Sequence, residues 1–311
     1  MKILGIDIGG TSIKGGLVDK EGKVEKLFSL PIEKSLNQEE QIDALIQRIK
    51  ETYKDDEFLG IGLGIPGAID SEAGVVVYSN NLDWHYLEIG KMLKNAFLGK
   101  EVQMTNDANA AALGETKFGS AKNEKNVVMI TLGTGVGSGI IIDGKLYEGE
   151  HGHDAELGHT SLVLDGVPCN CGRKGCFEVY ASATALVRQA KEAIKYNPEC
   201  KLALCAKNGD EVNGKLIFEV AKAGCTTAQK VIENYVRYLS EGLINICNVF
   251  RPSSIVLSGG IANQGSYLVD KVVAYLEKEH YGYEPKQEVK IKTASLGYNS
   301  GIIGAASLLL K

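Results

Sequence analysis

The sequence predicts an α/β protein built of two related lobes. Along its 311 residues, short apolar segments alternate with segments of helical periodicity, the order typical of sheets covered by helices. Residues 7–19 are also similar to residues 131–143, which indicates an internal repeat. The 37 glycines against 6 prolines favour many tight turns over stiff linkers. The length suits two domains, each with a core of its own.

The expected first lobe begins with an apolar strand over residues 2–7, followed by a glycine turn. Residues 12–18 and 23–30 form a hairpin around Asp19–Gly22. Residues 39–53 form a helix, because Ile42, Leu45, Ile46 and Ile49 recur at helical spacing. Strands are then expected at 59–67 and 102–105, and an alanine-rich helix at 107–118. Asp107 itself could cap that helix.

The expected second lobe has buried strands at residues 127–132, 254–257 and 289–291. Helices are expected at 183–194, 216–225, 228–249 and 300–310. The last helix returns to the first lobe.

The composition excludes several classes of protein. Asp and Glu number 39 and Lys and Arg 34, giving a net charge of −5, whereas a nucleic-acid-binding protein would show a basic face. No segment has the roughly 18 consecutive apolar residues of a membrane span. The first ten residues lack the order of a signal peptide, so a cytoplasmic location is expected.

The repeat places similar glycine turns after two strands. Gly9, Gly15 and Asp19 correspond to Gly133, Gly139 and Asp143 at a shift of 124 residues. Such turns aim backbone N–H groups into one concavity, which suits phosphate oxygens, and two facing turns would clamp a polyphosphate. Chance similarity between glycine-rich stretches is the alternative. Neither turn has the pattern of a P-loop or a dinucleotide-binding loop.

Three of the seven cysteines, Cys169, Cys171 and Cys176, lie within eight residues, ten residues after His159. Four nitrogen and sulfur ligands form a closed tetrahedral site for structural zinc. The alternative is three reduced thiols in a loop. The remaining cysteines are interpreted as buried, unreactive side chains, because a disulfide framework is not expected in a reducing compartment. These are Cys200, Cys205, Cys225 and Cys247.

Three glycine turns in order, DIGGT at 7–11, GTGVG at 133–137 and SGG at 258–260, resemble the superfold shared by sugar kinases, actin and heat-shock ATPases. The glycines of residues 132–159 and the ELGH and CNCGRKGCFE segments are similar to the ROK family (repressors, open reading frames and kinases), bacterial glucokinases above all. IPGAID (65–70), Asn80–Asn81 and Asn106–Asp107 match in the same order. The resemblance covers residues 3 to about 304. Asp154–Ala155 departs from the family pattern at the edge of the sugar pocket.

The resemblance implies two actin-like (ribonuclease H-like) lobes with a cleft between them. The small lobe would comprise residues 1–118 with 296–311, and the large lobe residues 119–295. ATP with Mg²⁺ would bind at the glycine turns, the sugar in the cleft, and Zn²⁺ at His159, Cys169, Cys171 and Cys176. A homodimer is expected by resemblance, with neither nucleic acid nor membrane as a partner.

The resemblance also assigns individual residues. Asp107 would be the general base, because a carboxylate between a strand and a helix is held rigidly; a plain helix cap is the alternative. Asp7 would hold the hydration shell of Mg²⁺. The sugar-binding residues would be Gly67, Asn81, Asn106, Asp107, Glu156, His159 and Glu178. The nucleotide-binding residues would be Asp7, Gly9, Gly10, Thr11, Ser12, Gly133, Thr134, Gly135, Val136, Gly137, Gly259 and Gly260. His151 and His153, close by, are interpreted as solvated groups that could also touch the site.

The function implied is ATP-dependent phosphorylation of a hexose, with glucose and its 6-hydroxyl first. N-acetylglucosamine, N-acetylmannosamine, allose and fructose are alternative acceptors, since small differences in a pocket decide specificity. A sugar-responsive transcriptional regulator shares the fold but would need a DNA-binding module before residue 7. A polymer-forming or chaperone-type ATPase would not require Asn106–Asp107, the two glutamates and the cysteine cluster together.

Overall fold

The computed structural model describes residues 2–150, 152, 155–207, 211–285 and 288–310. The contacts between residues divide the chain into two compact units. The first unit comprises residues 1–129, 139–155 and 295–311, and the second comprises 130–138 and 156–294. The domain bounds expected from the sequence, 1–118 with 296–311 and 119–295, stay a prediction.

A five-stranded mixed sheet forms the centre of the first unit. β1 pairs antiparallel with β2 and parallel with β4; β2 pairs antiparallel with β3, and β4 parallel with β8. The order is β3 (Val24–Pro31), β2 (Ser12–Asp19), β1 (Lys2–Ile8), β4 (Gly60–Ile65) and β8 (Glu101–Asn106). A smaller antiparallel sheet comprises β5 (Ala68–Asp70), β6 (Val75–Ser79) and β7 (Trp84–Leu87).

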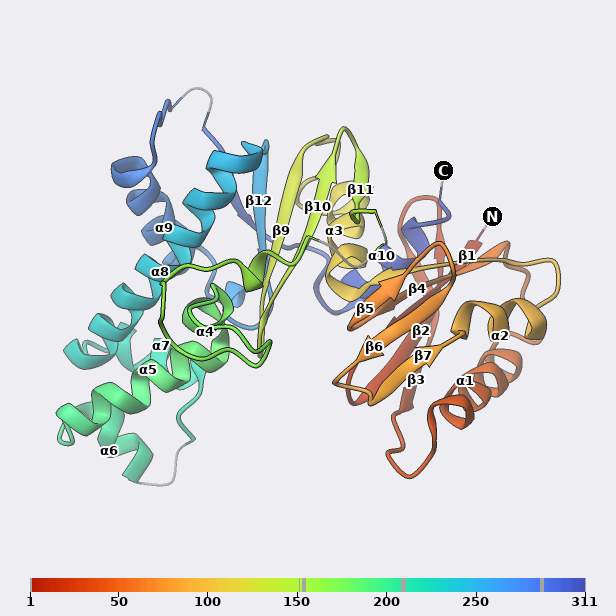
Figure 1. Cartoon of the computed structure of the whole chain (residues 1–311), viewed down its shortest axis with the longest axis horizontal. Coiled ribbons are helices and arrows are strands. Elements are labelled where there is room, and N and C mark those ends of the chain that lie inside the picture. The colour runs from red at the N-terminus through yellow and green to blue at the C-terminus, as the bar shows by residue number, and fades with distance from the viewer. Residues whose placement is uncertain (1, 151, 153–154, 208–210, 286–287, 311) are drawn as a thin grey trace. The chain divides into compact units, whose positions relative to one another are not determined.

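The alternation of side chains along β1 divides the packing of this unit into two faces. Leu4, Ile6 and Ile8 belong to the core formed with α1 (Gln38–Thr52) and α2 (Ile89–Ala96). The other face of β1 packs on α10 (Ser300–Ser307), which lies beside α3 (Asp107–Phe118) (Figure 1). A side chain at Gly5 would overlap the carbonyl of Ile302, so glycine is required for this close packing.

A second five-stranded sheet repeats the strand order of the first. In both sheets the first strand of the series lies centrally, with the next two strands on one side and two later strands on the other. The order is β11 (Lys145–Tyr147), β10 (Val136–Ile142), β9 (Val127–Leu132), β12 (Ser254–Ser258) and β13 (Lys290–Thr293). The sequence repeat therefore corresponds to a repeat of topology, and the expected α/β class is confirmed.

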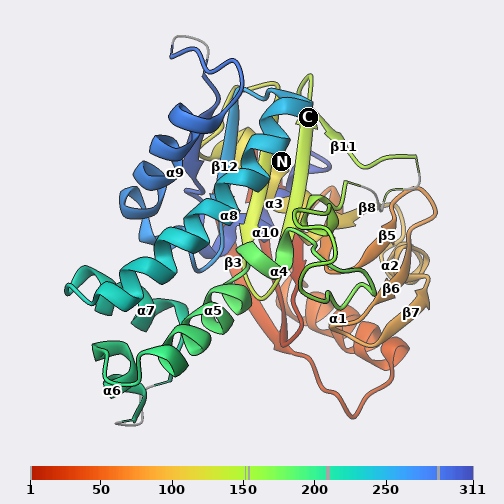
Figure 2. The same ribbon diagram turned by 60° about the vertical axis from the view of Figure 1, so that its left-hand side comes forward.

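The helices of the second unit surround one long helix, α8 (Thr226–Phe250). It packs against α4 (Glu178–Ala181), α5 (Ala183–Tyr196), α7 (Gly214–Lys222) and α9 (Ser266–Glu279), and Figure 2 shows α5, α7 and α8 as one layer. The short α6 (Lys201–Lys207) contacts α7. Short 3-10 helices cover Leu157–His159, Ala262–Gln264 and Gly297–Asn299. Within the described part of the chain, no helix has the length and apolar character needed to span a membrane.

Candidate active site and metal centre

The first glycine turn, residues 9–11, connects β1 to β2. The Gly9 N–H donates to the Ser12 carbonyl (2.9 Å), and the Thr11 carbonyl accepts from the Ile32 N–H (3.0 Å). Gly10 faces Asn81, whose Cβ would be 3.5 Å from a Cβ at Gly10. The turn is thus fixed at both ends, and the loop carrying the expected sugar-binding residue Asn81 lies against its middle.

Asp7 lies at the end of β1, just before this turn. Its side chain packs on α10, because a Cβ at Gly301 would overlap its carboxylate. Burial raises the pKa of Asp7 to about 6; the Asp107 carboxylate raises it further, and Lys14 opposes the shift. The two carboxylates therefore share one electrostatic environment, as a site for Mg²⁺ and phosphates requires.

Asn106, not Asp107, is the N-cap of α3. Its side-chain oxygen accepts from the Ala108 N–H (2.8 Å), and its amide donates to the Gly67 carbonyl (3.0 Å). The sequence-based alternative in which Asp107 is only a cap is therefore wrong. Asp107 is the first residue of the helix and is exposed to solvent, with one oxygen 2.9 Å from the same N–H. The protein around it nevertheless raises its pKa by desolvation, opposed by the backbone N–H of Ala108.

Gly67 adopts a φ of +119°, and a side chain there would overlap the Tyr78 carbonyl. Glycine therefore allows the loop after β4 to reach the Asn106 amide. On the other side of Asn106, Thr105 donates a hydrogen bond to the Glu148 carboxylate, whose pKa is raised by burial. The strand that ends at Asn106–Asp107 is thus held by two loops, and Glu148 is a supporting residue that the sequence analysis did not single out.

The second glycine turn, residues 133–135, connects β9 to β10. The Gly133 carbonyl accepts from the Ala183 N–H, and the Thr134 carbonyl from the Thr184 hydroxyl, both at 2.8 Å. The N–H groups of Val136 and Gly137 are bonded to Glu178 and to Thr131. The expected nucleotide contacts of Val136 and Gly137 therefore cannot use these N–H groups while those bonds last. A Cβ at Gly133 would meet no atom within 4 Å, which leaves open space beside the turn.

The third turn follows β12 and lies against the second. Gly259 has a φ of +88°, and a Cβ there would contact the Leu132 backbone at the end of β9. A Cβ at Gly260 would meet nothing within 4 Å. Gly259 thus lies against the end of β9, where both its positive φ and the close backbone contact require glycine, whereas the space around Gly260 is open.

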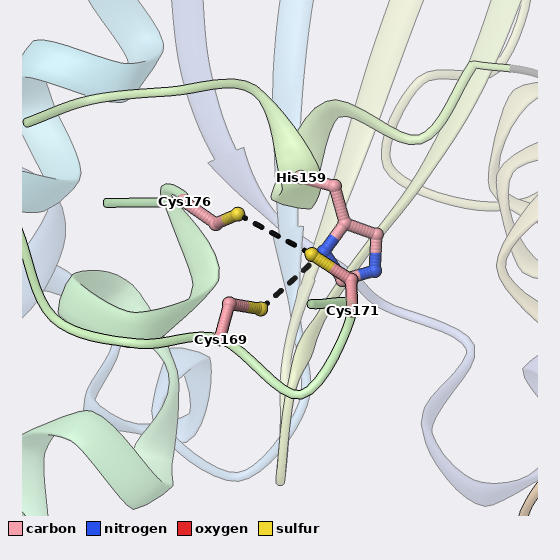
Figure 3. Close-up of side chains that lie close together, drawn as sticks. All are labelled: His159, Cys169, Cys171 and Cys176. Atoms are coloured by element: carbon pink, nitrogen blue, oxygen red, sulfur yellow. Dashed lines mark hydrogen bonds between the residues drawn. The ribbon is translucent and has the colours of Figure 1, made fainter. Parts of the chain in front are cut away.

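The four expected metal ligands, His159, Cys169, Cys171 and Cys176, come together in the second unit (Figure 3). Their ligand atoms all lie within 4.8 Å of one another. The Cys171 and Cys176 sulfurs are 3.6 Å apart, and the Cys169 sulfur is 3.8 Å from Nδ1 of His159. Tetrahedral zinc with Zn–S near 2.3 Å and Zn–N near 2.0 Å would place neighbouring ligands about 3.4–3.8 Å apart. The donor set and its spacing fit zinc.

The remaining expected sugar-binding residues border this cluster. Glu156 directly precedes the 3-10 helix that ends at His159, and its carbonyl accepts from the His159 N–H (3.0 Å). Glu178 begins α4; one of its oxygens lies 3.7 Å from the Cys169 sulfur. His151, His153 and Asp154 lie outside the described residues. The site residues thus form one group around Asp7 and Asp107 and another around Glu178, and their individual roles stay predictions.

The sequence profile of the ROK family matches residues 3–311. The chain belongs to the ROK family. It is 36% identical over 308 residues to a glucokinase of Streptomyces coelicolor, covering 98% of this chain and 96% of that protein. It is 34% identical over 315 residues to a glucokinase of Thermotoga maritima, covering 99% and 97%.

Among solved structures, the ROK family glucokinase of Streptomyces griseus in complex with glucose and AMPPNP is similar, with a TM-score of 0.83 and 34% identity. The match covers 99% of each chain. The expected ROK fold of two actin-like lobes is thereby confirmed.

Proposed function

We propose that this ROK protein is a glucokinase, which transfers a phosphoryl group from ATP to the 6-hydroxyl of glucose. The observation that carries the proposal is the position of Asp107. Asn106 caps α3, so Asp107 is not needed as the cap, although one of its oxygens also lies 2.9 Å from the Ala108 N–H. Relatives named glucokinase, 34–36% identical over nearly the whole chain, support glucose as the acceptor.

In this proposal Asp107 accepts the proton of the attacking hydroxyl. Its raised pKa brings its basicity closer to that of a working general base than an ordinary aspartate has. Phosphoryl transfer needs little covalent help, so positioning and charge supply most of the rate. As the family resemblance implies, we expect Gly67, Asn81 and Asn106 to bind the sugar, and Glu156, His159 and Glu178 to offer acceptors and a donor for its hydroxyls.

In the same proposal, ATP binds at the glycine turns. Backbone N–H groups of the first and second turns bind phosphate oxygens, and the Gly259–Gly260 turn borders the adenine. Mg²⁺ would neutralise charge on the phosphates, and the half-buried Asp7, whose pKa is raised in part by the Asp107 carboxylate, is expected to hold its water shell. Zinc at the four-ligand cluster would have a structural role, because His159, Cys169, Cys171 and Cys176 would fill all four positions. Action in the cytoplasm as a homodimer belongs to the same proposal.

The deciding experiment measures ADP release with ATP, Mg²⁺ and a panel of sugars: glucose, N-acetylglucosamine, N-acetylmannosamine, allose and fructose. Glucose is expected to give the highest kcat/KM, and Asp107→Asn to abolish most of the turnover. A higher kcat/KM for another sugar would replace the acceptor but keep the reaction class. Absence of sugar-stimulated ADP release throughout the panel would reject the kinase and favour a sugar-binding regulator.

A further inference from the structure

One lysine that the proposed mechanism does not use lies beside Asp7. β1 and β2 are antiparallel, and their register places Lys14 directly opposite Asp7. Directly opposed residues of neighbouring strands have their side chains on the same face of the sheet. Lys14 is therefore on the face that packs on α10, at the end of β2 next to the first glycine turn.

Lys14 and Asp7 are the first two positions of a row of directly opposed residues that crosses the sheet. Asp7 is opposite Gly64 of β4, and Gly64 is opposite Thr105 of β8. A Cβ at Gly64 would lie 3.7 Å from the Cα of Asp107, so the absent side chain leaves room for the head of α3. With strands about 4.8 Å apart, one cation and two carboxylates follow one another along the edge of the sheet, in the order Lys14, Asp7, Asp107.

Positive charge near Asp7 and Asp107 would favour the ionised form of these carboxylates. Burial and the Asp107 carboxylate both raise the pKa of Asp7 to about 6, and Lys14 is the cation that opposes them. Gly64 on β4 and Gly301 on α10, which pack around Asp7, carry no charge. A triphosphate bound at the turn would add several negative charges to the same place, so a nearby cation would stabilise the bound nucleotide.

The ammonium of Lys14 is also unused by the protein. It makes no hydrogen bond or ion pair with any residue in the described ranges, although the side chain is half-buried. Its neighbour on β3 is Ser29, an exposed uncharged residue. Other lysines in or next to this sheet do have acidic partners: Lys2 and Lys23 pair with Glu25, and Lys26 with Asp56. The ammonium of this half-buried lysine, without such a partner and beside a phosphate-type turn, is thus available to bind an anion.

We propose that the Lys14 ammonium binds the phosphate chain of ATP at the first glycine turn and is a further catalytic residue of the phosphoryl transfer. The proposal rests on ATP being the phosphoryl donor, as proposed above. Lys14 acts as a fixed point charge beside the Mg²⁺ carboxylate Asp7. It offsets negative charge on the phosphate oxygens both in the bound nucleotide and as charge moves to the leaving group during transfer.

The test separates binding from turnover. Isothermal titration calorimetry with AMP, ADP and ATP, without sugar, compares the wild type with Lys14→Met, which removes the charge but keeps much of the length. A charge-assisted hydrogen bond is worth about 1.5–3 kcal/mol, so the affinities for ADP and ATP should fall about 10- to 100-fold while that for AMP stays unchanged. In the kinase assay, kcat/KM should fall about 10²- to 10³-fold.

Two variants serve as controls. Lys14→Arg keeps the charge and should recover part of the ADP affinity, whereas a role in packing alone would not follow charge. Lys20→Met removes an exposed lysine just beyond the far end of β2 and should bind nucleotides like the wild type. Thermal unfolding of each variant establishes that the fold is kept.

The outcomes distinguish this proposal from the one it rests on. Normal ADP and ATP affinity in Lys14→Met, with normal turnover, would overturn the role of Lys14 and leave the glucokinase intact. An equal loss for AMP, ADP and ATP would also overturn it, because the effect would then not be on the phosphates. Selective loss of ADP affinity in a protein that phosphorylates no sugar would uphold Lys14 and reject the glucokinase.

Discussion

The Glu178 carboxylate accepts a hydrogen bond from the Val136 N–H at 2.9 Å, and its other oxygen lies 3.7 Å from the Cys169 sulfur. One side chain thus joins the second glycine turn to the metal cluster. It also explains why residue 135 is glycine, because a side chain there would overlap the Glu178 carboxylate. The two glycines of this turn, Gly133 and Gly135, therefore have different tasks, and mutation can separate them.

Gly133→Val should weaken ATP binding and leave glucose binding unchanged. A side chain at residue 133 meets no protein atom within 4 Å of its Cβ and so extends into the open space beside the turn. Gly135→Val should weaken both ligands, since it displaces Glu178. Calorimetry with AMPPNP and with glucose measures the two effects separately. If Gly133→Val binds AMPPNP with the affinity of the wild type, the phosphates bind elsewhere.

Asp107→Asn should lower kcat at least about 100-fold and leave the affinity for glucose nearly unchanged. General-base catalysis typically contributes about 10²- to 10⁴-fold, and asparagine keeps the shape of the side chain but cannot accept the proton. Steady-state kinetics and glucose titration measure the two quantities. A kcat near that of the wild type would remove Asp107 from the chemistry.

The neighbouring residue provides a matched contrast. Asn106→Ala removes the cap of α3 and the bond to Gly67. The free energy of unfolding should fall by about 1 kcal/mol, as for other lost N-caps. KM for glucose should rise more than kcat falls, because the Asp107 carboxylate is kept. Denaturant unfolding with steady-state kinetics distinguishes this pattern from that of Asp107→Asn.

Asp7→Asn should stabilise the protein at neutral pH while removing most of its activity. Burial raises the pKa of Asp7 from 3.8 to about 6, so the folded state binds this proton more tightly than the unfolded chain does. The free energy of unfolding therefore decreases as the pH rises from about 4 to about 6. The shift corresponds to about 1–3 kcal/mol, with some allowance for solvent screening.

The pH dependence is the discriminating part of this prediction. Asparagine has no proton to lose, so the stability gain of Asp7→Asn should be complete above about pH 6 and absent below about pH 4. Urea unfolding at several pH values measures it. A gain that does not change with pH would show that packing, and not the carboxylate charge, causes the difference.

Much of the fold could be predicted from local sequence patterns. The helix expected at 107–118 and the strand expected at 127–132 have those bounds in the structure, and the helix expected at 39–53 lies at 38–52. The sheet of β5, β6 and β7 was not predicted, because its strands are short, and because Asp83 just before β7 and Tyr86 within β7 have positive φ without being glycine. Helix α9 was also missed, since its buried residues, Leu268, Val272 and Leu276, follow a single i, i+4 row.

The candidate site also has features that the sequence predicts and features that it does not. The four metal ligands could be predicted because three of them are close in sequence and the donor chemistry is specific. The position of Lys14 opposite Asp7 and the bond from the Val136 N–H to Glu178 could not be predicted, because both depend on strand register or on contacts between distant segments. Sequence spacing reports residue type and local geometry, whereas long-range hydrogen bonds need the folded chain.

The last prediction is that His159 serves both zinc and sugar. Its Nδ1 faces the Cys169 sulfur, and a metal-bound imidazole carries a proton on its other ring nitrogen that normally binds an oxygen. That N–H is expected to donate to a sugar hydroxyl. Cys171→Ser should therefore lower the zinc content and raise KM for glucose far more than KM for ATP, because the Glu178 link to the ATP turn stays in place.

His159→Ala should lower the zinc content as well and weaken glucose further, since it also removes a direct contact. Cys205→Ser, a change on α6 away from the cluster, is the matched control and should behave like the wild type. Elemental analysis with two-substrate kinetics measures all three variants. Full zinc occupancy in Cys171→Ser would exclude this cysteine as a ligand. Equal losses for ATP and glucose would show that zinc holds the whole unit together and has no particular link to the sugar.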